Sequence, residues 1–263
     1  MHTLSALTPY ITRLTVPFLD IYTTIFVVKT EQGAVVFDTA TYPEDMDTYL
    51  VPALEKLGIG AEDLKYVVLS HNHRDHAGGL ARFAELFPGA AVAAGSRACE
   101  ERIPDRNVTV LKEGDTLLDV LQVVALPGHT ADCIGLLDTR TGTLLSGDGL
   151  QLFGIYGSGA WGANISYIKE HLALGKTLGE KKISVIAASH DYHPCGWKAE
   201  GEAVGPYIAE CAAALRAVAD FARANPDDSN EELAARYNAS SGLPTVGAHV
   251  FAAVRNAMAA GEM

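Results

Sequence analysis

Residues 70–79 read Ser-His-Asn-His-Arg-Asp-His-Ala-Gly-Gly and carry four potential metal ligands within six positions. Imidazole nitrogens and a carboxylate at this density suit Zn²⁺ or a similar divalent ion. A compact polar loop cannot point all of these groups at solvent or at a hydrophobic core, so a shared ion is the expected partner. The four candidate ligands are His71, His73, Asp75 and His76.

The flanking residues indicate where this motif lies in the fold. Lys65 to Leu69 is a short apolar run of β type, and the residues from Gly78 to Leu86 begin a helix. The motif is therefore expected on a strand-to-helix loop, where α/β proteins commonly place their chemistry.

Three further segments repeat this design, because in each an apolar strand ends and a His or Asp follows closely. These are His129 after 121–126, Asp148 after 144–145, and His190 after 183–188. Each alone is weak evidence, since a loop His or a turn Asp between glycines is common. If the strands share one direction, their ends crowd one edge. The combined set of imidazoles and carboxylates then suffices for two metals with open water positions.

The motifs H-x-H-x-D-H, P-G-H-T, S-G-D and a strand-borne S-H follow one another over roughly residues 20–195. This series resembles the metallo-β-lactamase superfamily. The resemblance implies an α/β fold, a four-layer αβ/βα sandwich in which two sheets pack face to face and helices cover the outside. It implies that His71, His73 and His129 hold one metal, that Asp75, His76 and His190 hold the second, and that Asp148 bridges both.

Asp38 follows the strand-like run 33–37 and resembles the family's buried aspartate at a strand end, which orients a metal ligand. A turn-capping Asp is the alternative. Asp75, by its family position, also orients the nucleophile or carries its proton. The residue at 148 separates the branches, because family members that hydrolyse β-lactams typically have Cys or Ser there. Glyoxalase-II-like thioesterases, lactonases, nucleases, phosphodiesterases and persulfide dioxygenases have Asp at this position.

Other branches are disfavoured. The flavodiiron branch usually has Glu in place of His73, and we expect no flavodoxin-like domain in addition to the metal-binding one. The chain's 263 residues leave no room for the inserted domain of the nuclease branch. A net charge of −12 and the lack of a basic cluster also disfavour a nucleic-acid substrate.

The N-terminal residues show no secretory signal, and no run approaches the length of a membrane span. The four cysteines form no C-x-x-C pair, as expected for reduced thiols in the cytoplasm. We therefore expect a cytoplasmic enzyme with a small-molecule substrate and no membrane partner. A homodimer is left open.

Residues 1–198 are expected to form the metal-binding catalytic domain, and 199–263 a helical subdomain packed on it as cover, lid or dimer surface. Helices are expected over 45–57, 164–178, 203–224 and about 245–259, with Ser229 and Glu232 as a capping box for another. Gly242-Leu243-Pro244 is expected to separate the last two.

The segment 153–162 is glycine-rich, carries Tyr156 and Trp161, and follows Asp148 closely. We predict a flap that contacts the substrate; the alternative is a loop anchored to the core by these aromatics. Tyr156, Tyr192 and His193 are the candidates for a proton donor or a clamp on the substrate carbonyl.

These observations predict a dinuclear metal-dependent hydrolase of a lactone or thioester that uses a metal-bridging hydroxide. The expected cofactor is two divalent metal ions, with Zn²⁺ preferred and Fe or Mn as the alternatives. Such ions lower the pKa of water to about 7 and stabilise the oxyanion. Two other enzymes on this fold are the alternatives, a mononuclear iron persulfide dioxygenase and a phosphodiesterase. A ligand-binding protein on a degenerate scaffold is disfavoured, because a degenerate member should have lost ligands.

Overall fold

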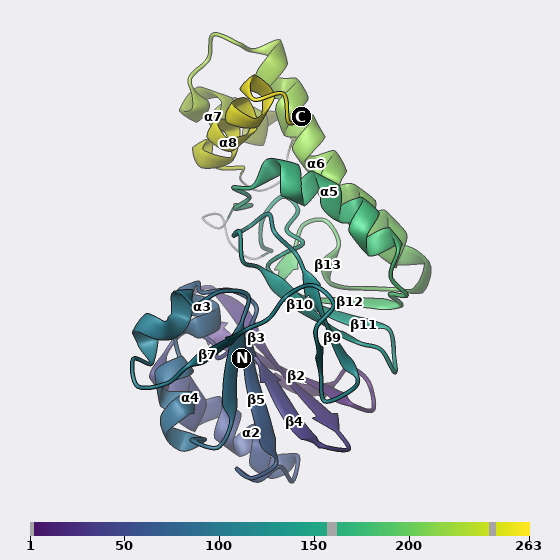
Figure 1. Cartoon of the computed structure of the whole chain (residues 1–263). Helices are drawn as coiled ribbons and strands as arrows, with labels where there is room; N and C mark the ends of the chain where they lie inside the picture. Colours follow the sequence, from purple (N-terminus) through teal and green to yellow (C-terminus); the bar gives the residue numbers. More distant parts are fainter. Residues whose placement is uncertain (1–2, 157–161, 242–245) are drawn as a thin grey trace. The chain divides into compact units, whose positions relative to one another are not determined.

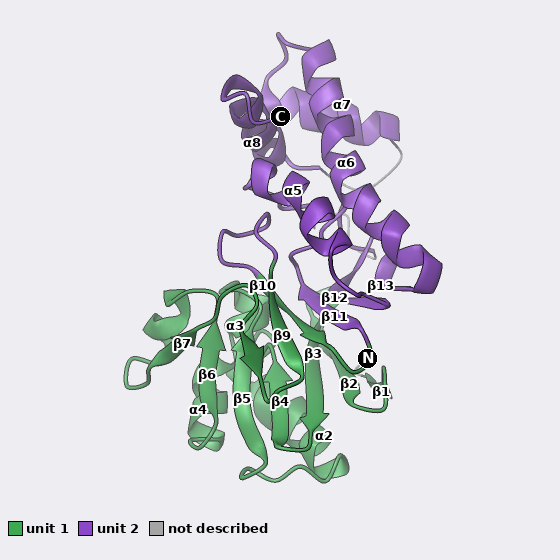
Figure 2. Cartoon of the chain, turned by 45° about the vertical axis from the view of Figure 1, so that its right-hand side comes forward, with its two compact units in different colours: residues 1–125, 134–141 green, residues 126–133, 142–263 purple. Residues whose placement is uncertain are grey.

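The computed structural model of the chain describes residues 3–156, 162–241 and 246–263 (Figure 1). The chain divides into two compact units. Unit 1 comprises Met1–Ala125 and Ile134–Thr141, and unit 2 comprises Leu126–Cys133 and Gly142–Met263 (Figure 2). The boundary predicted at residue 198 lies within unit 2, and a separate helical subdomain from 199 to 263 stays a prediction.

Unit 1 contains a seven-stranded mixed sheet whose strands follow chain order from β1 to β7. The first four strands pair antiparallel and β4 to β7 pair parallel. Tight turns join antiparallel neighbours, whereas each parallel step needs a longer crossover connection. The strands are β1 (Thr3–Ala6), β2 (Ile11–Phe18), β3 (Ile21–Thr30), β4 (Gly33–Phe37), β5 (Leu64–Leu69), β6 (Ala91–Ala94) and β7 (Val108–Val110).

The hydrophobic core of unit 1 lies between this sheet and its crossover helices. Val67 and Leu69 of β5 are two residues apart and so share a face, where they belong to one buried cluster with Met46, Leu50 and Phe83. Truncating a fully buried Phe such as Phe83 typically costs about 3–5 kcal/mol of folding free energy. The helical segments are α1 (Pro43–Asp45), the π-helical η1 (Met46–Leu50), α2 (Val51–Lys56), α3 (Arg74–Ala77), α4 (Leu80–Leu86) and the 3₁₀ helix η2 (Ala98–Arg102).

Each unit contains three of the remaining strands. In unit 1, β9 (Leu121–Ala125) pairs antiparallel with both β8 (Thr116–Leu117) and β10 (Ile134–Asp138). In unit 2, β12 (Val185–Tyr192) pairs parallel with β11 (Thr143–Gly147) and antiparallel with β13 (Gly196–Glu200). The parallel pair β11–β12 needs a crossover connection, and helix α5 (Ile168–Gly179) is part of the chain segment that connects the two strands.

The helices of unit 2 agree with the predicted spans except at their starts. The capping box is confirmed, since Ser229 N–H donates to Glu232 Oε2 at 2.8 Å and Glu232 N–H to Ser229 Oγ at 3.2 Å. The helix predicted from residue 164 begins at Ile168, after the N-cap Tyr167, whose φ of −109° and ψ of 79° are not helical; Ser166 and Tyr167 N–H donate to the Gly128 carbonyl. The other helical segments are η3 (Gly201–Ala203), α6 (Val204–Ala224), α7 (Asn230–Ser241) and α8 (Ala248–Ala259).

The predicted break at Gly242-Leu243-Pro244 and the predicted helix start near Thr245 lie outside the described residues. Among the helices that are described, none is both long enough and apolar enough to cross a membrane.

Candidate metal centre

The first group of predicted ligands lies at one edge of the unit 1 sheet. Strands β4 and β5 are parallel neighbours, and Phe37 pairs with Val68, so both strands end at the same edge. Asp38 and Ser70 follow these ends, and Ser70 N–H donates to Asp38 Oδ1 at 2.7 Å. Asp38 has a left-handed backbone with φ of 67°, uncommon for a non-glycine residue and typical of a constrained position.

The carboxylate of Asp38 fixes the orientation of His76. Asp38 Oδ2 accepts a hydrogen bond from His76 Nδ1 at 2.8 Å and another from Ser70 Oγ at 2.9 Å. Burial raises the pKa of Asp38 above its ordinary value, and the neighbouring His76 and Ser70 oppose that rise. Of the two interpretations of Asp38, the structure therefore favours a residue that orients His76 over a simple turn cap.

This contact determines which nitrogen of His76 can bind a cation. Because Nδ1 carries the proton that goes to Asp38, Nε2 carries the lone pair. Nε2 lies 3.4 Å from Asp75 Oδ2, so two electron-rich atoms face each other. Such a pair requires a cation, either a metal ion or an added proton. The donor set of unit 1 therefore fits a divalent metal.

His71 and His73 complete the group in unit 1. The His71 ring lies 4.6 Å from the His73 ring and 4.2 Å from the His76 ring, measured between centroids. His71 and His73 precede helix α3, whereas Asp75 and His76 lie within it, so the predicted strand-to-helix loop contains a short helix. Gly78 permits the tight path that follows, since a Cβ there would lie 1.9 Å from the Thr41 carbonyl oxygen.

The second group of predicted ligands lies in unit 2. Gly147 of β11 pairs with Ala188 of β12, so Asp148, which follows β11, lies beside His190 in the last part of β12. Asp148 Oδ1 lies 3.5 Å from His190 Nε2, and Asp148 Oδ2 lies 3.8 Å from His129 Nε2. Each carboxylate oxygen thus faces a different imidazole, as expected of a carboxylate that bridges two cations.

Two residues that sequence reasoning missed hold this second group in place. Gln151 Nε2 donates to Asp148 Oδ2 at 3.2 Å, and Gln151 Oε1 accepts the Asn164 N–H at 2.7 Å. His129 Nδ1 lies 2.5 Å from the Asn164 carbonyl oxygen. The one available signal was a polar residue at position 151 inside the otherwise apolar run 150–153.

The remaining candidate catalytic residues also lie in unit 2. Tyr192 is fully buried in β12, with its ring edge-on to that of His190. Tyr156 is 41% exposed, its hydroxyl donates to the Pro194 carbonyl at 3.2 Å, and its ring lies against that of His193. Partial burial lowers the pKa of His193. Trp161 lies outside the described residues, so the predicted flap is described only at its ends.

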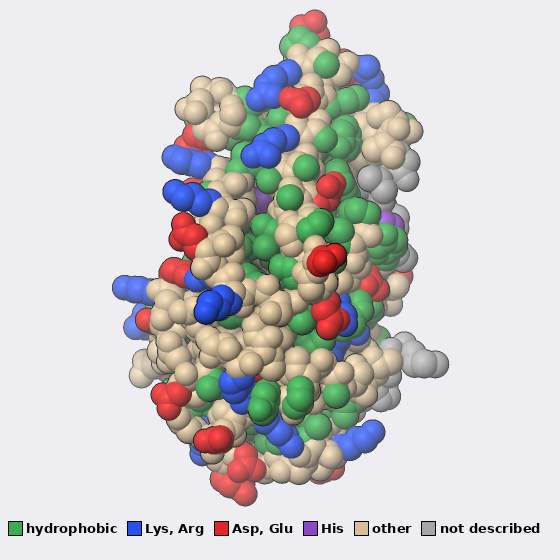
Figure 3. Space-filling model, turned by 90° about the vertical axis from the view of Figure 1, so that its right-hand side faces the viewer, with side chains coloured by type: hydrophobic (Ala, Val, Ile, Leu, Met, Phe, Trp, Pro, Cys, Tyr) green, Lys and Arg blue, Asp and Glu red, His purple; other side chains and the backbone are tan. Residues whose placement is uncertain are grey.

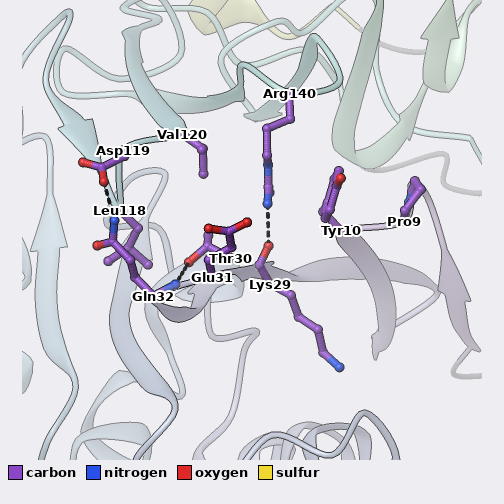
Figure 4. A pocket seen from close by; sticks show the side chains of 10 residues that line it. All are labelled: Pro9, Tyr10, Lys29, Thr30, Glu31, Gln32, Leu118, Asp119, Val120 and Arg140. Carbon is purple, nitrogen blue, oxygen red and sulfur yellow. Dashed lines mark hydrogen bonds between the residues drawn. The ribbon is translucent and has the colours of Figure 1, made fainter.

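A cavity of about 450 Å³ lies elsewhere in unit 1 and includes none of the predicted site residues (Figure 4). Two pairs of its lining residues hydrogen-bond to each other: Arg140 Nη1 donates to the Lys29 carbonyl at 3.0 Å, and Gln32 donates to Asp119. The cavity adjoins the β3–β4 turn, at the start of β4, whereas Asp38 follows the end of that strand. Size alone does not make it the site, because the chemistry-bearing side chains lie elsewhere.

Among the described residues, the His, Cys, Asp and Glu side chains grouped closely enough to hold metal ions are the seven predicted ligands. Seven such donors are more than one tetrahedral ion can use, which is consistent with a dinuclear metal site.

Comparison with known proteins places the chain in a family. Residues 20–190 match the family model described as "Metallo-beta-lactamase superfamily". An uncharacterized protein of Bacillus subtilis, YobT, is 28% identical over 171 residues, which cover 54% of this chain and 72% of that protein. A hydroxyacylglutathione hydrolase of Pseudomonas putida is 40% identical over 96 residues, 33% of this chain. The chain spans only 34% of that enzyme's length.

The solved structures show the same fold. A metallo-beta-lactamase family protein from Thermus thermophilus superposes with a TM-score of 0.68 at 21% identity, over 95% of this chain and 92% of that protein. The predicted fold class is thereby confirmed: two mixed sheets with helices, followed by helices α6–α8. The predicted enzyme class, a hydrolase of this superfamily, agrees with the match to hydroxyacylglutathione hydrolases. Because the family match covers more than half of its residues, the chain belongs to the metallo-beta-lactamase superfamily.

Proposed function

We propose that this protein is a dinuclear metal-dependent hydrolase of an ester-like bond, a lactone or a thioester. The observation that carries the proposal is the arrangement of Asp148, whose two carboxylate oxygens lie 3.5 and 3.8 Å from the Nε2 atoms of His190 and His129. A carboxylate between two imidazoles suits a bridge between two ions rather than a single tetrahedral ion.

The family assignment divides the ligands into two sets. His71, His73 and His129 hold one ion in this proposal, Asp75, His76 and His190 hold the other, and Asp148 is shared. Bound divalent ions supply Lewis acidity and a water whose pKa is lowered to about 7. We expect Zn²⁺, with Fe and Mn as the alternatives, because imidazole and carboxylate ligands suit all three.

The chain's own residues orient the reactants. Asp75, whose carboxylate lies 3.4 Å from His76 Nε2, would orient the nucleophilic water and take up its proton, the role that its family position implies. Asp38 holds His76 with Nε2 available, through the 2.8 Å hydrogen bond to Nδ1. Tyr156 and His193 form an aromatic pair on the surface of unit 2 and are the candidates to contact the substrate carbonyl. Tyr192 is fully buried and is better suited to supporting His190.

A thioester is favoured among the substrates by the match to hydroxyacylglutathione hydrolases, whose name describes hydrolysis of an acyl thioester of glutathione. The match covers a third of this chain, so the acyl and thiol groups of the substrate are not carried over. A lactone requires the same attack on an activated carbonyl. A persulfide dioxygenase and a phosphodiesterase remain the competing enzymes on this fold.

A small-molecule substrate and the cytoplasm stay our proposals for partner and location. The net charge of −12 supports a partner other than nucleic acid. On the face that Figure 3 shows, the Lys and Arg side chains of the described residues are interspersed with Asp and Glu side chains, which also opposes a phosphate-binding tract. A homodimer stays open.

The test is elemental analysis of the purified chain combined with a substrate panel. The panel contains lactones, acyl-glutathione thioesters, a phosphodiester, and a persulfide with an oxygen electrode. We expect two zinc equivalents per chain and turnover of a lactone or thioester that chelation abolishes and zinc restores. One iron per chain with oxygen consumption on the persulfide would instead establish the dioxygenase, and turnover of the phosphodiester alone would establish a phosphodiesterase.

A further inference from the structure

Gln151 is a buried polar residue in unit 2 with both ends of its amide engaged. It follows Asp148 by three positions and is 3% exposed. A buried amide is costly unless its donor and acceptor are both satisfied, so its contacts should be specific. Its neighbours are two predicted metal ligands, Asp148 and His129, and the backbone of Asn164.

The orientation of the Gln151 amide follows from its partners. The Asn164 backbone N–H can only donate, so the atom that faces it at 2.7 Å must be the oxygen, Oε1. The other end is then the NH₂ group, which lies 3.2 Å from Asp148 Oδ2 and donates to that carboxylate. Both assignments agree, so the amide has one orientation that satisfies both ends.

The proton position on His129 follows by the same reasoning. His129 Nδ1 lies 2.5 Å from the Asn164 carbonyl oxygen, which can only accept, so Nδ1 carries the proton. The 3.1 Å approach of Gln151 Nε2 to Nδ1 is therefore a close contact of two donors and not a hydrogen bond. His129 Nε2 is left with its lone pair, on the side that faces Asp148 Oδ2 at 3.8 Å.

We propose that Gln151 is a positioning residue that fixes two metal ligands at once. It orients Asp148 directly, and it fixes His129 through the backbone of Asn164, whose N–H donates to Gln151 Oε1 and whose carbonyl accepts from His129 Nδ1. This inference rests on the proposed function in that both residues serve as metal ligands.

The contacts of Gln151 distinguish this role from simple core packing. An apolar side chain would fill the same volume and need no hydrogen-bond partner, whereas the amide of Gln151 bonds at one end to Asp148 and at the other to the backbone of Asn164, which contacts His129. Replacing an outer partner of a metal ligand typically lowers metal affinity about 10- to 100-fold. A packing role would change stability of the metal-free protein and leave that affinity alone.

The experiment measures Zn²⁺ affinity of the full chain by competition with a chromophoric chelator, and the visible spectrum of the Co²⁺-loaded protein. The variants are Gln151→Met, which keeps the length and removes both hydrogen bonds, and Gln151→Asn, which keeps the amide but is one methylene too short to span both partners. The matched control is Gln122→Met, the same change at a half-buried Gln of β9. Thermal unfolding of each metal-free variant shows whether it folds.

We expect both Gln151 variants to fold and to bind zinc about 10- to 100-fold more weakly than wild type, with altered Co²⁺ bands, while Gln122→Met matches wild type. Wild-type affinity and spectra in folded Gln151→Met or Gln151→Asn overturn the inference, and leave the proposed function intact. If wild type binds zinc but hydrolyses nothing in the panel, the proposed function fails, and the zinc measurements still decide the role of Gln151. A wild-type chain that binds no metal overturns both.

Discussion

The predicted ligand groups of unit 1 and unit 2 are built in contrasting ways. In unit 1, four predicted ligands come from one short motif, and the partner behind His76 is the buried carboxylate of Asp38, at 2.8 Å. In unit 2, three predicted ligands come from three separate segments, and the partners behind Asp148 and His129 are a neutral side-chain amide and a backbone carbonyl. The unit 1 group is contiguous in sequence and has a charged hydrogen-bond partner, whereas the unit 2 group comes from distant segments and has neutral hydrogen-bond partners.

This difference follows from what each ligand must do. His76 is a neutral imidazole, so a negative partner on Nδ1 raises the electron density at Nε2 and strengthens it as a ligand. Asp148 is already negative, and a second charge behind it would oppose its ionised form. A neutral donor such as Gln151 orients the carboxylate without that repulsion. The comparison therefore predicts which replacements matter in each unit.

The largest effect is expected at Asp148, the residue that both ions share in the proposed site. Asp148→Asn removes the negative charge and one of the two facing oxygens, so we expect loss of one of two zinc equivalents. Turnover should fall by more than the ~100-fold that an outer partner typically costs. Elemental analysis after gel filtration and kcat/KM on the best substrate measure both. Unchanged metal content and activity would remove Asp148 from the site.

Asp38→Asn tests whether the charged partner in unit 1 matters more than the neutral partner in unit 2. The amide can present its NH₂ group to His76 Nδ1, which favours the tautomer with the proton on Nε2 and blocks that nitrogen as a ligand. The variant also removes the negative charge behind His76, whereas Gln151→Met leaves the charge of Asp148 in place. Zinc affinity should therefore fall by about 100-fold, the upper end of the range for an outer partner, and by more than in Gln151→Met.

The control for Asp38 is Asp45→Asn in the same unit. Asp45 is also buried, and its carboxylate accepts the N–H groups of Tyr42 and Thr41 at 2.8 and 3.1 Å. It touches no predicted ligand, so its loss should lower stability and leave zinc affinity unchanged. An Asp38→Asn protein that binds zinc as well as Gln151→Met would contradict the contrast between the two units.

The same contrast explains what could be predicted from the sequence. The unit 1 motif is contiguous, so residue types and spacing sufficed to predict which of its side chains lie close together. Asp148 and His190 were predicted as neighbours because each ends or extends an apolar strand run, and parallel strands present those ends at one edge. Gln151 was missed, and α5 was predicted to start too early, because both depend on the backbone around Gly128 and Asn164. Those contacts join segments distant in sequence, and no local pattern reports them.

A buried histidine makes unit 2 sensitive to acid in a way that is separate from metal binding. His171 of α5 is buried, and loss of solvent lowers its pKa to about 4. In the unfolded chain the His171 imidazole has its ordinary pKa of 6.5, so between pH 6.5 and pH 4 the unfolded chain binds a proton that the folded chain does not. The free energy of unfolding therefore has its full value above pH 6.5 and falls as the pH drops toward 4. A shift of this size corresponds to about 2 kcal/mol between pH 8 and pH 5.

Urea unfolding of the metal-free protein at both pH values measures this loss, and His171→Leu should reduce it by about that amount. A chelator is present throughout to keep the protein metal-free, because metal binding is itself pH-dependent and would add to the measured change in stability. An equal pH dependence in wild type and His171→Leu would assign the acid sensitivity to other groups.

The smallest effect is expected at Tyr156, which lies outside both ligand groups. Its ring lies against His193 and its hydroxyl donates to the Pro194 carbonyl at 3.2 Å. If the ring packs on the apolar part of a substrate, Tyr156→Ala removes a contact worth about 1 kcal/mol and raises KM about 5-fold, with metal content unchanged. Tyr156→Phe separates the two parts of the side chain, because it keeps the ring and removes only the hydroxyl. A drop in kcat in both variants would assign the hydroxyl to the carbonyl, and wild-type kinetics in both would leave Tyr156 as a surface anchor of its loop.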